Sequence, residues 1–268
     1  MITPNDPVKQ DNHIACDTAA LMIKSRMPHA LPSLDRATPR RRQVQDVVLQ
    51  KIRNGLMVGA FVPGQVMSLR KLAASLGTSP MPVREAFKQL VAANALEELP
   101  NHSVRVPRLS AERIAELFSV REVVEGMAAK AACTNVTPSL IQQLEAINRE
   151  LIGAISKRDI LGCLAKNQIF HFTLYAAAKS ETLKPLIESL WLQCGPTMYF
   201  SLLSPEMPWD ASAHAEILQG LKAKKPAVVQ RALSKDMRTT AKNLLRNAHS
   251  PHLNGLASVQ FGDFSAAF

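Results

Sequence analysis

Two histidines and an aspartate in the second half of the chain are the side chains best suited to hold a metal ion or an anion. His171 lies in the apolar stretch FHFTLY, where an imidazole without a partner would carry a desolvation cost. Asn167 precedes it by four residues, so a helix places both on one face. His214 and Asp236 lie 22 residues apart, and an antiparallel helix pair would bring both toward one bundle interior. We predict that all four side chains meet in one buried pocket.

Such a pocket has two possible chemistries. Two histidines and a carboxylate suit zinc, nickel or manganese, because neutral imidazole favours borderline metals and a carboxylate adds charge. The same histidines can instead be satisfied core residues or direct hydrogen-bond donors to an anion. A buried, unpaired Asp236 would be strongly unfavourable, so a metal or a cationic imidazole would have to compensate it. With metal, we expect an open coordination position for a small carboxylate, and without metal the histidines bind that anion directly.

The elements that must position these residues are predominantly helical from Ser110 onward. Prolines 138, 185 and 226 stand at helix starts, where a missing N–H is harmless, and Pro196 should kink or split its helix. The apolar spacing predicts six helices. They cover about residues 111–133, 138–155, 159–178, 182–203, 212–223 and 226–247.

A different pattern precedes these helices. Helical periodicity over residues 44–55 predicts a first helix. Ser68 can cap a short second helix that ends at Gly77, and Ser79 can cap a third helix with Pro80 at its first position. Two helices joined by a tight turn make a helix-turn-helix. The period then changes to two, and Leu96 to Leu99 and Ser103 to Pro107 read as a hairpin around Pro100–Asn101–His102.

The fold class is therefore mainly α: an N-terminal winged helix-turn-helix and a C-terminal all-α helical bundle. The net charge of +10 is concentrated in the first part, since residues 36–108 hold twelve Lys/Arg against four Asp/Glu. Neutralising phosphates with such a local excess releases condensed counterions, so the charge favours a nucleic-acid partner. A merely solubilising basic surface is the alternative.

The DNA-binding pattern resembles the GntR family of bacterial regulators over Pro63 to Leu99, PGQVMSLRKLAASLGTSPMPVREAFKQLVAANALEEL. The match rests on Pro-Gly before the second helix, the Leu76–Gly77 turn, and P-V-R-E-A followed by K-Q-L. The later helices resemble the FCD sensor domain of the FadR-like branch. They do so through VREVVE (Val120 to Glu125), NQIFHFTLY (Asn167 to Tyr175) and HAEILQGL (His214 to Leu221).

The third helix corresponds in this resemblance to the recognition helix, whose N-terminal side chains reach base edges in the major groove. Arg84 stands in its first turn, off the apolar stripe, so its guanidinium fork can match a guanine edge. Lys88, one turn further on, is expected at phosphate. An exposed helix with ordinary solubilising charges is the alternative.

Other DNA contacts are implied by position. Arg70, at the start of the second helix, matches a family position that contacts DNA. Pro80 stands where the family usually has a DNA-contacting arginine, and proline supplies neither charge nor donor. Recognition of the bases must therefore depend more on the remaining arginines and on Thr78 and Ser79, so the operator sequence can be atypical. His102, in the wing turn, can approach the minor groove or remain a solvent-exposed turn residue.

The resemblance also implies a metal site beneath a carboxylate ligand. The family pattern is an acid on one helix, a histidine four residues on, and two further histidines on later helices. This chain has Asn167, His171, His214 and Asp236 at those positions. Asparagine thus replaces the usual acid, and aspartate replaces the last histidine.

Arg121 matches a further family position and can bind a ligand carboxylate through its planar fork, beside Asn167, His171 and His214. Its alternative is a structural pair with Glu125, four residues on. The implied function is a ligand-responsive transcriptional repressor that binds a palindromic operator as a homodimer and senses a small carboxylate. A metal-dependent hydrolytic enzyme fused to a DNA-binding domain is the alternative, but H-E-x-x-H, a nucleophile motif and a glycine-rich phosphate loop are missing.

The expected organisation has four parts: a disordered arm (1–35), the winged helix-turn-helix (36–108), the sensing and dimerisation domain (109–248) and a flexible tail (249–268). A secretory signal and a membrane-spanning apolar run are missing from the sequence, so we expect a cytoplasmic protein with no membrane partner. The four cysteines lie far apart without a C-x-x-C pair and are expected to be reduced thiols.

Overall fold

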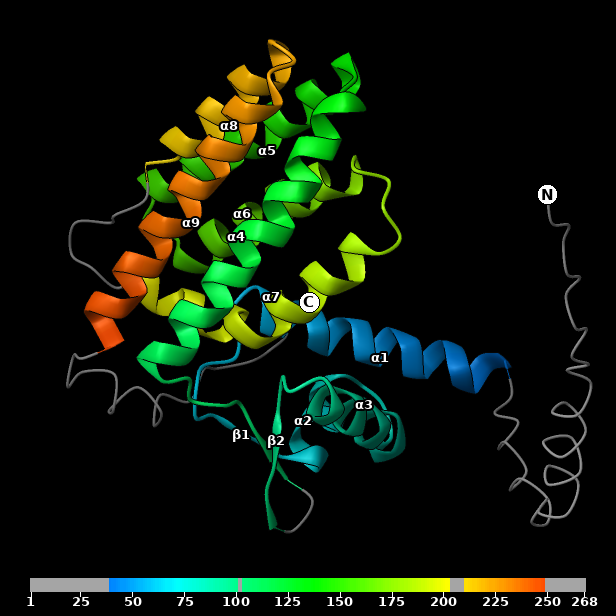
Figure 1. The fold of residues 1–268 in the computed structure, drawn as a ribbon. Coiled ribbons are helices and arrows are strands. Elements are labelled where there is room, and N and C mark those ends of the chain that lie inside the picture. The colour runs from blue at the N-terminus through cyan, green and yellow to red at the C-terminus, as the bar shows by residue number, and fades with distance from the viewer. Residues whose placement is uncertain (1–38, 101–102, 203–209, 249–268) are drawn as a thin grey trace, which may run out of the picture. The chain divides into compact units, whose positions relative to one another are not determined.

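The computed structural model describes residues 39–100, 103–202 and 210–248. The predicted arm (1–35), the predicted tail (249–268) and His102 lie outside the described residues. Helices make up most of the described chain, which confirms the mainly α fold class (Figure 1). In these described ranges, no helix is long and apolar enough to cross a membrane.

Three helices form the helix-turn-helix and its support: α1 (Pro39–Met57), α2 (Leu69–Ser75) and α3 (Pro80–Ala92). The first helix begins five residues before the predicted residue 44 and ends two after residue 55, because its apolar period does not mark the polar first turn. The turn residue Gly77 has φ +62°, the left-handed conformation expected after a helix end. Ser68 and Ser79 occupy the N-cap positions in extended conformation, but their side chains make no capping hydrogen bond.

A three-stranded antiparallel sheet completes the winged helix-turn-helix. Its strands are β1 (Val66–Met67), β2 (Glu97–Glu98) and β3 (Val104–Arg105), in the order β1-β3-β2. The predicted hairpin is correct in place, although its paired strands are shorter than the predicted segments. The sequence prediction missed β1, because two residues show no alternation and become a strand only by pairing with β3.

Six α-helices and one short 3-10 helix follow β3 in the described part of the chain. Each of these α-helices starts within one residue of its predicted position. Side-chain caps fix three of the starts: Ser110 accepts from the backbone N–H of Arg113, Thr137 from that of Leu140 and Asp159 from that of Gly162. The elements are α4 (Ala111–Thr134), α5 (Pro138–Ser156), α6 (Ile160–Ala176), α7 (Leu183–Met198), η2 (Tyr199–Leu202), α8 (Ser212–Lys222) and α9 (Pro226–Ala248).

Helices α6, α8 and α9 face one interior from different sides. Helix α9 lies along both α4 and α8, and α5 packs against α6 (Figure 1). The predicted segment 182–203 is interrupted as expected from Pro196, but two residues later than the proline. Helix α7 contains Pro196, remains α-helical to Met198, and then tightens into η2.

Candidate functional site

The structure brings His171, His214 and Asp236 together from α6, α8 and α9. The Nε2 atom of His171 lies 3.2 Å from Oδ2 of Asp236 and 3.3 Å from Nε2 of His214. Each residue offers one ligand atom, and these three atoms lie within 4.8 Å of one another. Both histidines are buried, while the Asp236 side chain keeps 25% of its surface exposed. This geometry matches a ligand set for one metal ion reached from one side.

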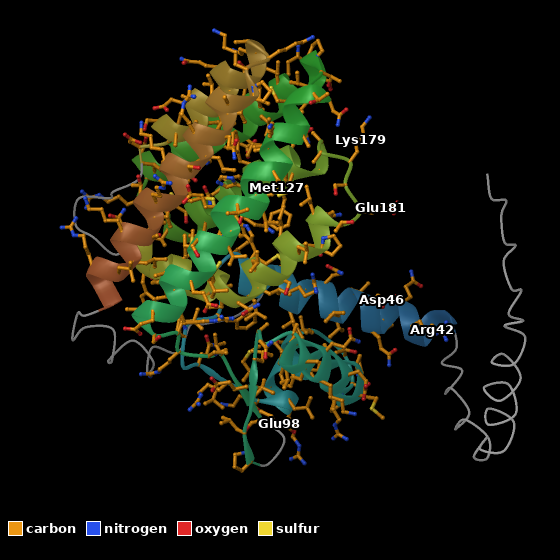
Figure 2. All side chains as sticks on the ribbon, in the orientation of Figure 1. Arg42, Asp46, Glu98, Met127, Lys179 and Glu181 are labelled. Atoms are coloured by element: carbon orange, nitrogen blue, oxygen red, sulfur yellow. The ribbon has the colours of Figure 1, made fainter. Side chains whose placement is uncertain are left out.

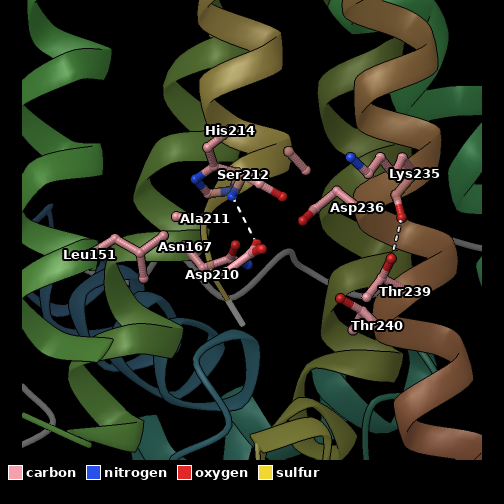
Figure 3. Close-up of a pocket in the computed structure, with 11 residues that line it drawn as sticks. Leu151, Asn167, Asp210, Ala211, Ser212, His214, Lys235, Asp236, Thr239 and Thr240 are labelled. Carbon is pink, nitrogen blue, oxygen red and sulfur yellow. Dashed lines mark hydrogen bonds between the residues drawn. The ribbon is translucent and has the colours of Figure 1, made fainter. Parts of the chain in front are cut away.

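A cavity of about 260 Å³ adjoins this cluster (Figure 3). His214 and Asp236 face it from α8 and α9, and Asn167, from α6, also lines it. His171 and Arg121 are not among its lining residues. The rest of the wall is mainly small and polar. It consists of Leu151, Asp210, Ala211, Ser212, Ala213, Lys235, Thr239 and Thr240.

The two imidazole rings are held in place by packing and by hydrogen bonds. His214 stacks on Phe170 with centroids 3.9 Å apart and an interplanar angle of 7°, and its Nδ1 lies 3.2 Å from Oδ1 of Asn148. His171 Nδ1 lies 3.1 Å from the hydroxyl of Tyr175. Tyr175 follows His171 by four residues, and this spacing could have identified it as a partner. Asn148 has no such signal, because it lies on a different helix.

Arg121 is fully engaged in a buried network. Its Nε donates to Oε1 of Glu125 at 2.7 Å, and the hydroxyl of Tyr175 donates to Oε2 of the same carboxylate at 2.5 Å. The guanidinium carbon also lies 4.7 Å from the ring centroid of Phe118 and 4.6 Å from that of Trp191. The pair with Glu125, one of the two interpretations from the sequence, is therefore present.

The electrostatics of the cluster favour neutral imidazole beside a carboxylate. Burial lowers the pKa of His214 to about 3. Burial acts to raise the pKa of Asp236, but the hydrogen bond and charge of His171 hold that pKa below its ordinary value. Burial, and then the charge of Glu125, raise the pKa of Tyr175 well above its ordinary range. His214 is thus neutral and Asp236 ionised near neutral pH, which are the forms that bind metals.

The candidate DNA-binding side chains lie on α2 and α3 and in the turn between them. Arg70, Ser79, Arg84 and Lys88 are exposed, and Thr78 is partly buried. Arg84 makes no ion pair with any described residue, whereas Lys88 lies 3.1 Å from Glu85 on its own helix. On the opposite side of α3, Val83, Phe87 and Leu90 are buried.

Direct contacts join α1 to α7 and to α6, which carries His171. Arg53 in α1 donates to Glu188 in α7 at 2.8 Å, and Gln168 in α6 donates to the Met57 sulfur at 3.7 Å. The backbones approach closely at Gly195 in α7, where an added Cβ would lie 2.5 Å from the carbonyl oxygen of Leu56. Helix α1, which supports the helix-turn-helix, is therefore in contact with both α6 and α7.

Comparisons with known proteins agree with this architecture. Residues 44–106 match the "Bacterial regulatory proteins, gntR family" domain, and residues 116–239 match the FCD domain. The chain is 32% identical to the HTH-type transcriptional regulator McbR of Escherichia coli over 177 residues, 65% of this chain and 80% of that protein. It is 29% identical to a probable D-xylose utilization operon transcriptional repressor of Paenarthrobacter nicotinovorans, covering 72% of this chain and 83% of that one. A solved structure, E. coli McbR/YncC, superposes with a TM-score of 0.72 at 28% identity, over 76% of this chain and 97% of that one.

Proposed function

This chain belongs to the GntR family of bacterial regulatory proteins and carries an FCD domain, and from that premise we propose that it is a homodimeric, ligand-responsive repressor. As a family member it is a DNA-binding transcriptional regulator and not an enzyme. The alternative of a metal-dependent hydrolase has no support among its relatives. The observation that carries the sensing half is the convergence of His171, His214 and Asp236 beside a cavity of about 260 Å³.

The metal-binding proposal is supported by the chemistry of that convergence. His171, His214 and Asp236 would hold a divalent zinc, nickel or manganese ion, with Asn167 beside them. The family resemblance implies three imidazoles and one acid, and here the acid stands on α9 instead of α6. One carboxylate charge is therefore retained, and only an imidazole is exchanged for an amide. Bound there, the metal supplies an electrophilic position for a ligand oxygen.

The effector proposal follows from the shape and charge of the cavity. About 260 Å³ holds only a small molecule, and the metal-facing end favours an anion. Ser212, Thr239 and Thr240 line the remaining wall and can bind further oxygen atoms of the ligand. A small carboxylate fits both ends. If the site holds no metal, we expect the histidines to bind the same anion directly.

The homodimer proposal is supported by an apolar face of α4. Val120, Val123 and Met127 share one side of the helix with 44%, 61% and 54% of their surfaces exposed, and Figure 2 shows Met127 on the outside of α4. Glu116 and Lys130 stand seven residues before and after Val123. An antiparallel pair of α4 helices on a two-fold axis at Val123 therefore places each Glu116 opposite Lys130 of the partner subunit. Two-fold symmetry requires this kind of self-complementarity.

Coupling between sensing and DNA binding is supported by the contacts of α1. Helix α6 carries Asn167 and His171 and also contacts Met57, while α7 contacts α1 through Glu188 and Gly195. A ligand can shift the operator-competent population only by its differential affinity for two arrangements. Operator and effector should therefore alter each other's affinity by one common factor.

The DNA-binding half is tested on operator fragments selected from genomic DNA. Arg84→Ala should lose about 1–3 kcal/mol of specific binding with an unchanged fold, because it removes an exposed base-reading fork. Lys88→Ala, the matched control on the same helix face, should weaken all sequences alike and flatten the salt dependence. If Arg84→Ala binds the operator like the parent at matched salt, the recognition helix is assigned wrongly.

A further inference from the structure

Both histidine rings of the candidate metal centre are bound at the nitrogen that faces away from it. The hydroxyl of Tyr175 lies 3.1 Å from Nδ1 of His171, and Oδ1 of Asn148 lies 3.2 Å from Nδ1 of His214. A neutral imidazole carries one proton, so the partner at Nδ1 decides whether Nε2 has a proton or a lone pair. These two contacts therefore set the state of the nitrogens that face the centre.

The direction of the hydrogen bond at His171 is set by a buried ion pair further away. Nε of Arg121 lies 2.7 Å from Oε1 of Glu125, and both side chains of this ion pair are buried. A carboxylate only accepts hydrogen bonds, so the Tyr175 hydroxyl donates its single proton to Glu125 at 2.5 Å. The Tyr175 oxygen can then only accept, and the donor is the Nδ1–H of His171. The order along the chain of contacts is Arg121, Glu125, Tyr175, His171.

The same argument applies to His214, where a single hydrogen-bond partner sets the direction. The oxygen of the Asn148 amide accepts, so Nδ1 of His214 is the donor. Phe170 stacks on the ring and fixes its plane, which leaves Nε2 directed at His171. A ring that carries one proton, held at Nδ1, has a lone pair at Nε2.

We propose that Tyr175, Glu125 and Asn148 are positioning residues, which hold both imidazoles as Nδ1–H tautomers so that two Nε2 lone pairs and the Asp236 carboxylate face one point. This inference rests on the proposed function, in which that point holds a divalent metal. It also gives Arg121 a different role from the carboxylate contact implied by the family resemblance. Arg121 anchors the hydrogen-bond chain, in agreement with its absence from the cavity wall.

Packing alone does not balance this arrangement. The two Nε2 atoms are 3.3 Å apart, and Nε2 of His171 also lies 3.2 Å from Oδ2 of Asp236. With both Nδ1 protons held by their outer partners, two ring nitrogens and a carboxylate converge on one point. A positive charge has to lie between them, either a metal ion or a second proton on Nε2 of His171 that is donated to Asp236.

The test compares zinc affinity and histidine tautomers in the full-length protein. Tyr175→Phe removes the acceptor at His171 with little change of shape, and Tyr199→Phe, in η2, is the control for loss of a tyrosine hydroxyl. Asn148→Leu removes the acceptor at His214, whereas Asn148→Asp keeps it and strengthens it. Zinc dissociation constants come from competition with a chelator. Nitrogen-15 NMR of the histidine rings in the zinc-free protein reports the tautomers, and thermal unfolding checks that each variant folds.

Tyr175→Phe and Asn148→Leu should each bind zinc about 10- to 100-fold more weakly, as removal of an outer hydrogen-bond partner typically does. Tyr199→Phe and Asn148→Asp should bind like the parent or more tightly. The parent should show protonated Nδ1 in both rings, and Tyr175→Phe should lose that signature at His171 alone. A Tyr175→Phe protein with parental zinc affinity, or a parent whose His171 carries no proton on Nδ1, overturns the inference. A folded parent that binds no zinc, nickel or manganese refutes the proposed metal site itself.

Discussion

Replacing Gly195 by alanine tests the contact between the end of α1 and helix α7. An alanine Cβ at this position would lie 2.5 Å from the carbonyl oxygen of Leu56, 2.7 Å from Cα of Met57 and 2.9 Å from its carbonyl oxygen. All three are backbone atoms, so no side chain can rotate away. The end of α1 and helix α7 must separate, or one of them must bend. Forced overpacking of this kind costs about 1–3 kcal/mol.

The matched control is Gly153→Ala. Gly153 lies in α5, and an added Cβ there meets nothing within 4 Å. Both substitutions gain the same helix propensity, about 1 kcal/mol, which cancels between them. Gly195→Ala should therefore be less stable than Gly153→Ala by about 1–3 kcal/mol in urea unfolding, and its effector response should also fall. Equal stability of the two variants would refute the close backbone contact between α1 and α7.

Two further predictions concern pH and assembly. Burial lowers the pKa of His214 to about 3 from an ordinary 6.5, so below pH 6.5 the unfolded chain binds one proton more than the folded chain. The metal-free protein should therefore lose about 1.4 kcal/mol of stability per pH unit as pH falls from 6.5 toward 3. His214→Gln should remove that slope in urea unfolding, and an unchanged slope would contradict the assignment. Val123→Arg should yield monomers in light scattering. Glu116→Lys should weaken the dimer, and adding Lys130→Glu in the double variant should restore it. If Val123→Arg forms dimers as stable as those of the parent, the interface lies elsewhere.

Local signals explain why so much of the fold could be predicted. Prolines 138 and 226 and the capping residues Ser110 and Asp159 act on their own helix ends, so helix positions follow from neighbouring residues alone. Gly77 is equally local, since its positive φ belongs to the turn itself. Strand β1 could not be predicted in this way, because its only defining feature is pairing with a strand 38 residues away.

The candidate site likewise combines features that local sequence signals predict with features that depend on packing between helices. The spacing of Asn167 and His171 on one helix and the family resemblance together bring the four side chains to one region. The role of Arg121 depended on which neighbour it meets, and the sequence left the carboxylate ligand and Glu125 as alternatives. The stacking of Phe170 and the acceptor role of Asn148 require the packing of α5, α6 and α8, which the helical periodicity of one segment does not encode.

The most direct test of the central claim is a titration of selected operator DNA by the parent and by the double variant His171→Ala/His214→Ala. Each protein is supplied with zinc, and the titration is repeated with a series of small mono-, di- and tricarboxylates. Without carboxylate, both proteins should bind the operator equally. At least one carboxylate should change the operator affinity of the parent several-fold and leave that of the double variant unchanged. A carboxylate that shifts both proteins by the same factor would contradict the claim that His171 and His214 form the sensing site.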